Sequence, residues 1–68
     1  MIENNTLVEF RISPAGMPKY GHVTGFTFES GRSLYLVKAD DGIYHIPPED
    51  IRPILDGEAV MLRIKGVL

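Results

Sequence analysis

The sequence contains no cysteine, no large excess of charge of either sign and no long apolar run. Without cysteine, the chain cannot form a disulfide or bind zinc or an iron–sulfur cluster through thiolates. Seven Lys and Arg residues stand against nine Asp and Glu residues, for a formal net charge of −2. This balance argues against a nucleic-acid binder, which usually presents a basic face. No stretch approaches the roughly 20 apolar residues of a membrane-spanning helix, so no membrane segment is expected.

The N-terminal residues 1–6 have neither the basic region nor the apolar core of a signal peptide. Together with the lack of cysteine, this predicts a cytoplasmic protein. The 68 residues are 44% hydrophobic and 24% charged, which is typical of a single small globular domain spanning residues 1–68. A domain of this size buries only about 60% of its surface. We therefore expect it to gain stability from a protein partner or from a second copy of itself.

Short apolar runs separated by glycine, proline and Asp-Gly predict an all-β fold, and no window of a dozen residues shows helical spacing. The expected strands span residues 6–12, 20–29, 34–39, 43–46, 54–55 and 59–65. In the last of these, Val60, Leu62 and Ile64 fall on one face by alternation. The order of elements is typical of a small SH3-like barrel of five to six strands.

Turn-forming residues divide these runs. Two prolines and a glycine within residues 13–18 predict a first loop of about eight residues. Gly25 predicts a bulge in the second strand, and Asp-Gly within residues 40–42 predicts a tight hairpin. Pro48 can begin a single 3-10 turn that buries Ile51, so one such turn is expected near Pro48–Ile51.

Four segments carry a family resemblance: Gly21-His22-Val23-Thr24-Gly25-Phe26, Tyr35-Leu36-Val37, Ile43-Tyr44-His45-Ile46-Pro47 and Ile51-Arg52-Pro53-Ile54. They resemble the small SH3-like barrel proteins of plasmids and mobile elements, among them the plasmid-borne type II dihydrofolate reductases. The resemblance covers about half of the chain and implies a shared barrel fold and an origin on a plasmid, phage or integron. That family works as a tetramer around a pore and uses a Val-Gln-Ile-Tyr segment. Here Tyr44 replaces the glutamine and Ile46 the tyrosine, so the reductase activity does not carry over.

Residues able to carry chemistry are few and scattered. The two histidines, His22 and His45, have no recognised metal-ligand spacing to each other or to carboxylates. The acidic pairs Asp40-Asp41, Glu49-Asp50 and Asp56/Glu58 fall in expected turns, where local backbone contacts explain them. The sequence therefore predicts no catalytic, cofactor or metal site.

Aromatic residues are concentrated in the central strands. Phe26 and Phe28 share one face by alternation, so both can be exposed only if that face is an interface. One interpretation places the phenylalanines in the core and the tyrosines at its rim. The other places tyrosines in a protein-binding surface beside a stiff, proline-containing loop. The residues of this candidate interaction surface are Met17, Pro18, Tyr20, Tyr35, Tyr44 and His45.

The function expected from the sequence is that of a small non-catalytic interaction module, acting by protein–protein binding or by self-association. Two alternatives remain. One is a nucleic-acid-associated accessory barrel, which the charge balance disfavours. The other is a pore-type oligomeric enzyme related to type II dihydrofolate reductase, in which Tyr44 or His45 of several copies would line a shared cavity.

Overall fold

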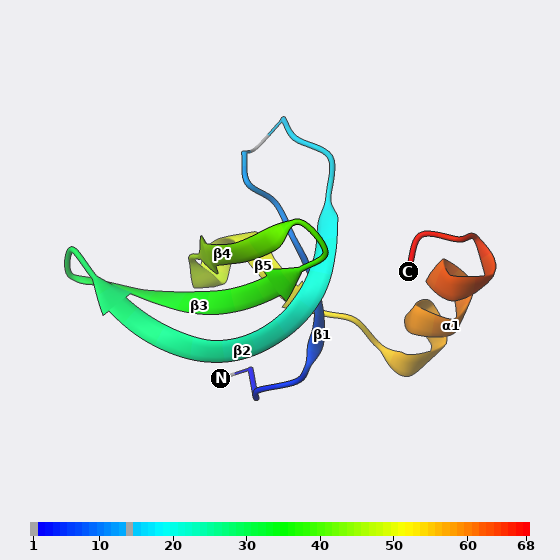
Figure 1. The fold of residues 1–68 in the computed structure, drawn as a ribbon, viewed down its shortest axis with the longest axis horizontal. Coiled ribbons are helices and arrows are strands. Elements are labelled where there is room, and N and C mark those ends of the chain that lie inside the picture. Colours follow the sequence, from blue (N-terminus) through cyan, green and yellow to red (C-terminus); the bar gives the residue numbers. More distant parts are fainter. Residues whose placement is uncertain (1, 14) are drawn as a thin grey trace.

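The computed structural model describes residues 2–13 and 15–68 (Figure 1). Met1 of the N-terminal segment and Pro14 of the expected first loop lie outside the described residues. The fold is mostly β, as predicted: five antiparallel strands in one sheet, one 3-10 turn and one short helix. The elements are β1 (Leu7–Phe10), β2 (Lys19–Glu29), β3 (Arg32–Ala39), β4 (Gly42–Ile46), η1 (Pro48–Asp50), β5 (Ile51–Pro53) and α1 (Asp56–Ile64).

The long strand β2 connects the two halves of the sheet, whose strand order is β4-β3-β2-β1-β5. Its beginning pairs with β1, and its remainder pairs with β3 in the long curved hairpin of Figure 1. The pairing shifts register between Val23 and Gly25, which confirms the predicted bulge. The curvature brings β1 toward β4 although two strands separate them in the sheet: the rings of Phe10 and Tyr44 have centroids 5.3 Å apart.

The core lies on the inner, concave face of the sheet. Its buried residues are Val8, Phe10, Val23, Tyr35, Val37 and Ile46. Gly21 lies opposite Val8 on this face, and a Cβ atom at Gly21 would come within 2.5 Å of the carbonyl oxygen of Lys38. Glycine is therefore required there for β2 and β3 to approach closely.

The sheet contains two tight hairpins, β2–β3 and β3–β4, and the second is the one predicted from Asp-Gly within residues 40–42. Ser30 and Gly31 connect β2 to β3 with φ angles of 52° and 76°, the left-handed conformation that two-residue hairpin loops favour. Asp40 and Asp41 connect β3 to β4, and here the positive φ, 143°, belongs to Gly42 at the start of β4. The predicted 3-10 turn is also present, with Ile51 half-buried directly after it.

The expected strand over residues 59–65 is wrong, because Asp56–Ile64 form the helix α1. Apolar residues in this segment fit two periods: alternation, and the helical spacing of Gly57, Val60, Met61 and Ile64. Acidic residues in the first turn and Arg63 in the last stabilise the helix dipole. The helix ends at Ile64, and Gly66 after it has a φ of 77°, which lets the amide of Val67 donate to the carbonyl of Leu62 at 2.9 Å.

The expected strand over residues 54–55 is also wrong, because the last strand comes earlier. Ile51–Pro53 form β5, which pairs with β1 at the edge of the sheet. Proline is tolerated in such an edge strand because one side of the strand needs no amide donor. Ile54 follows β5 as a buried residue, and its amide donates to the carbonyl of Leu7 at 3.0 Å.

Candidate functional site

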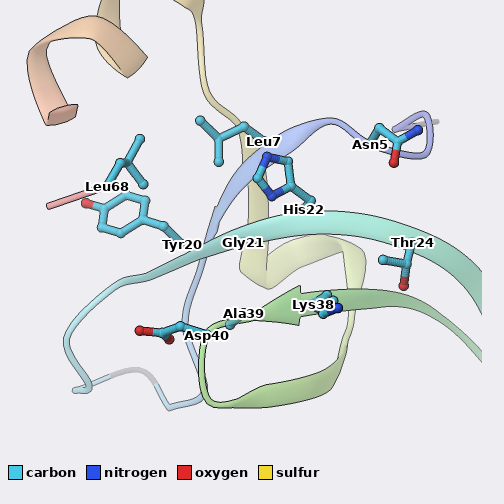
Figure 2. A pocket seen from close by; sticks show the side chains of 10 residues that line it. All are labelled: Asn5, Leu7, Tyr20, Gly21, His22, Thr24, Lys38, Ala39, Asp40 and Leu68. Carbon is cyan, nitrogen blue, oxygen red and sulfur yellow. The ribbon is translucent and has the colours of Figure 1, made fainter.

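A hollow of about 430 Å³ lies on the outer face of the sheet (Figure 2). Gly21 faces the core with Val8, so its neighbours Tyr20 and His22 point to the outer face by alternation. We call this cavity the Tyr20 hollow. It is lined by Asn5, Leu7, Tyr20, Gly21, His22, Thr24, Lys38, Ala39, Asp40 and Leu68.

The lining of the Tyr20 hollow combines apolar and charged groups. Figure 2 shows the His22 ring beside the Leu7 side chain, with Tyr20 and Leu68 together at one end. Lys38 and Asp40 place opposite charges along its other side. Among the residues that the structure describes, the side chains lining the hollow form no ion pair with one another.

Pro18 and Tyr20, two residues of the predicted interaction surface, lie together at one side of this region. They line a second hollow of about 410 Å³ with Asp40 and Leu68, which border the Tyr20 hollow as well. Met17 precedes them in the first loop and is 85% exposed. That these residues bind a protein stays a prediction.

The other three residues of the predicted surface lie elsewhere. Tyr35 is buried in the core, and its hydroxyl accepts a hydrogen bond of 3.0 Å from the amide of Ile2. Tyr44 lies on the inner face next to Phe10. His45 is exposed on the opposite face of β4, with Nδ1 2.9 Å from Oε2 of Glu29. The six residues therefore do not form one continuous surface.

A hydrogen-bonded cluster of Lys19, Asp41 and Tyr44 joins the start of β2 to the β3–β4 turn. Lys19 Nζ and the Tyr44 hydroxyl donate to Oδ2 of Asp41 at 2.9 and 2.7 Å. The hydrogen bond from Lys19, followed by that from Tyr44, lowers the pKa of Asp41. Asp41 in turn raises the pKa of Lys19 and of Tyr44. Because its raised pKa keeps the Tyr44 phenol protonated, Tyr44 donates its hydroxyl proton to Asp41, and the cluster ties the start of β2 to the β3–β4 turn.

One exposed apolar surface was not included in the interaction surface predicted from the sequence. It consists of Phe26 and Phe28, which are 46% and 67% exposed. Both lie on the face that carries the core, because Phe26 pairs with Tyr35 and Phe28 with Ser33. The rings of Phe26 and Tyr35 meet edge to face, with centroids 5.6 Å apart. We call Phe26 and Phe28 the Phe26–Phe28 patch. The sequence signal was the alternation itself, which predicts exposure of both only at an interface.

The patch is exposed because the β2–β3 hairpin extends past its neighbours. The pairing of β4 with β3 ends at Tyr35, and that of β1 with β2 ends at His22. Polar contacts join the hairpin tip to β4 and η1: Nδ1 of His45 lies 2.9 Å from Oε2 of Glu29 on the face opposite the patch, and Arg32 pairs with Glu49 of η1.

Within residues 2–13 and 15–68, no three His, Cys, Asp or Glu side chains are grouped so that they could hold a metal ion. The helix in this part of the chain is not long and apolar enough to cross a membrane. Comparisons of the chain with protein-family models, with curated proteins and with solved structures find no match.

Proposed function

We propose that the protein is a non-catalytic interaction module that binds an apolar segment of a partner protein through the Phe26–Phe28 patch. The observation that carries this proposal is the exposure of two phenylalanines side by side on one face of one hairpin. Complete burial of each ring would contribute about 1.5–3 kcal/mol. Aromatic side chains that fill a partner's pockets are frequent anchors of protein interfaces.

The module has, in this proposal, the SH3-like barrel fold that the resemblance to plasmid-borne type II dihydrofolate reductases implies, and the mobile-element origin that goes with it. The strand order β4-β3-β2-β1-β5 and the 3-10 turn between β4 and β5 support this assignment. The contact between the rings of Phe10 and Tyr44 supports a sheet that curls on itself. Because the sequence has no cysteine, we place the binding in the cytoplasm.

The hairpin also offers backbone groups to a partner. Among the described strands, β3 alone pairs with β2 beyond Gly25, so the other edge of residues 26–29 is free. An extended partner segment would form main-chain hydrogen bonds along this edge and place alternate side chains against Phe26 and Phe28. The proposed ligand is therefore an extended peptide with apolar residues at every second position.

A peptide library displayed on phage tests the proposal with the full chain as the target. Peptides selected on the wild-type protein should show alternating apolar residues. They should bind the double variant Phe26→Thr/Phe28→Thr at least about tenfold more weakly. Threonine preserves strand propensity at both positions. The matched control is Ile43→Thr in β4, which removes another exposed apolar side chain outside both the patch and the predicted interaction surface and should bind as the wild type does. Equal binding to the double variant, or a selection that enriches no peptide, would contradict the proposal.

A further inference from the structure

The helix α1 carries an apolar stripe that the described residues leave about half exposed or more. Gly57, Val60, Met61 and Ile64 follow the spacing i, i+3, i+4 and i+7, which places them on one helix face. Val60, Met61 and Ile64 are 52%, 52% and 74% exposed. We call these four residues the α1 stripe. In Figure 1, α1 lies beside the sheet at the end of a connecting segment.

The opposite side of α1 is held to the sheet. Ala59 is its buried residue, and the guanidinium of Arg52 in β5 donates to both carboxylate oxygens of Glu58, at 3.0 and 2.5 Å. The same guanidinium donates to Glu9 of β1 at 3.0 Å. The hydrogen bond from Arg52 lowers the pKa of Glu58. These contacts fix the orientation of the helix: Val60 borders a hollow of about 500 Å³ that α1 forms with β1 and β2, whereas Met61 and Ile64 do not border it.

The helix is too short to be stable through its backbone alone. It has nine residues, whereas isolated helices need roughly 12–15 to be even marginally stable in water. Gly57 and the β-branched Val60 and Ile64 are also weak helix formers. Further apolar contact on the α1 stripe would supply the stability that length and propensity do not.

We propose that the α1 stripe packs against the same stripe of a second copy, with the two helices antiparallel, to form a symmetric homodimer. An antiparallel two-fold arrangement places Val60 opposite Met61 and Gly57 opposite Ile64. The stripe is therefore complementary to itself, because Ile64, its most exposed side chain, faces Gly57, which has no side chain. Two-fold interfaces require this kind of self-complementarity.

The charges beside the stripe select the antiparallel arrangement. At 100° per residue, Asp56 and Arg63 lie on one flank of the stripe and Glu58 and Lys65 on the other. In the antiparallel dimer each flank faces the same flank of the second copy, with the chain direction reversed. Asp56 then lies near Arg63 of the second copy, and Glu58 lies near its Lys65. A parallel pair would bring acidic residues to acidic ones and basic residues to basic ones. Within the described part of the chain, Asp56 and Arg63 have no ion-pair partner of their own.

This inference extends the proposed function by a second surface. The α1 stripe and the Phe26–Phe28 patch share no residue, so loss of the dimer and loss of peptide binding are separate outcomes. A variant that removes one contact should leave the other intact.

Sedimentation velocity on the full chain, up to about 1 mM because the contact is small, tests the dimer. The wild type should change with concentration from the 7.6 kDa monomer toward twice that mass. Ile64→Lys and Met61→Lys should each raise the dissociation constant at least about tenfold. The matched control Ile12→Lys adds the same charge at an exposed apolar residue outside α1 and outside the predicted interaction surface, and it should dimerise as the wild type does. A wild type that stays monomeric, or a dimer that survives both substitutions, would overturn the proposal.

A charge exchange tests the antiparallel orientation. Arg63→Glu places two acidic residues together on one flank and should weaken the dimer. The double variant Asp56→Arg/Arg63→Glu restores opposite charges between copies and should recover dimerisation, although both new charges oppose the helix dipole. Recovery cannot come from a more stable helix, so it reports the contact between copies. No recovery, or a monomer that binds anionic phosphatidylglycerol vesicles through α1 instead, would contradict the proposal.

Discussion

Apolar side chains are buried on the inner face of the sheet but exposed on two projecting elements, the β2–β3 hairpin tip and α1. Val8, Phe10, Val23 and Val37 of the sheet are at most 1% exposed. The phenylalanines of the hairpin tip and the apolar stripe of α1 are about half exposed or more. The core accounts for folding, whereas the projecting elements present apolar surface that folding does not use. The proposed contact surfaces therefore both lie at the periphery of the sheet.

Two phenylalanine truncations should separate these regions most strongly. Phe10→Ala should lower the free energy of unfolding by about 3–5 kcal/mol, because it leaves a cavity in the core. This is a large part of the roughly 5–15 kcal/mol that stabilises a typical domain. Phe28→Ala, the matched control at the hairpin tip, should change it by no more than about 0.5 kcal/mol. Urea denaturation measures both, and similar losses would mean that the hairpin tip belongs to the folding core.

Acid should release α1 before it affects the core. The pKa of Glu58 lies below its ordinary value of 4.5 because of the hydrogen bond from Arg52. A lowered pKa in the folded state means that the contact stabilises the fold above pH 4.5 and is lost as the pH falls through the lower folded value. The pKa of Asp41 is likewise lowered, from an ordinary value of 3.8, by the hydrogen bond from Lys19. Its contacts therefore also stabilise the fold above that pH and are lost on further acidification.

The Arg52–Glu58 contribution can be isolated with Glu58→Gln, which removes the carboxylate. Amide exchange of α1 at a single low protein concentration should quicken on acidification in the wild type after correction for intrinsic rates. In Glu58→Gln it should already be fast at neutral pH and change little. A wild-type helix whose protection is unaltered down to about pH 2 would show that Arg52 does not hold α1 to the sheet.

Local sequence pattern was enough for most of the sheet. The four longer strands, the bulge at Gly25 and the turn after Pro48 were predicted because alternation, glycine and proline act over a few residues. The helix was not predicted, because the apolar residues between Gly57 and Ile64 fit strand and helix periods equally well. The exposure of Phe28 depends on where β4 ends relative to β3, which is a long-range property of the pairing register.

The predicted interaction surface was also only partly correct in its grouping of residues, because local sequence does not determine which residues come together. Pro18 and Tyr20 are two positions apart in the sequence and lie together around one hollow. Tyr35 was grouped with them by residue type, but alternation along β3 places it in the core opposite Phe26. Residue type indicates what a side chain can bind, whereas only the face on which it lies determines whether it is accessible.

Amide hydrogen exchange across a series of protein concentrations tests the central claim most directly, since it compares the two regions within one molecule. The account predicts that protection of Val23 and Val37 is high and independent of concentration. Protection of α1 should be low in dilute solution and rise as dimers form. Protection of α1 that equals that of the core at every concentration would contradict the account, because the helix would then need no second copy.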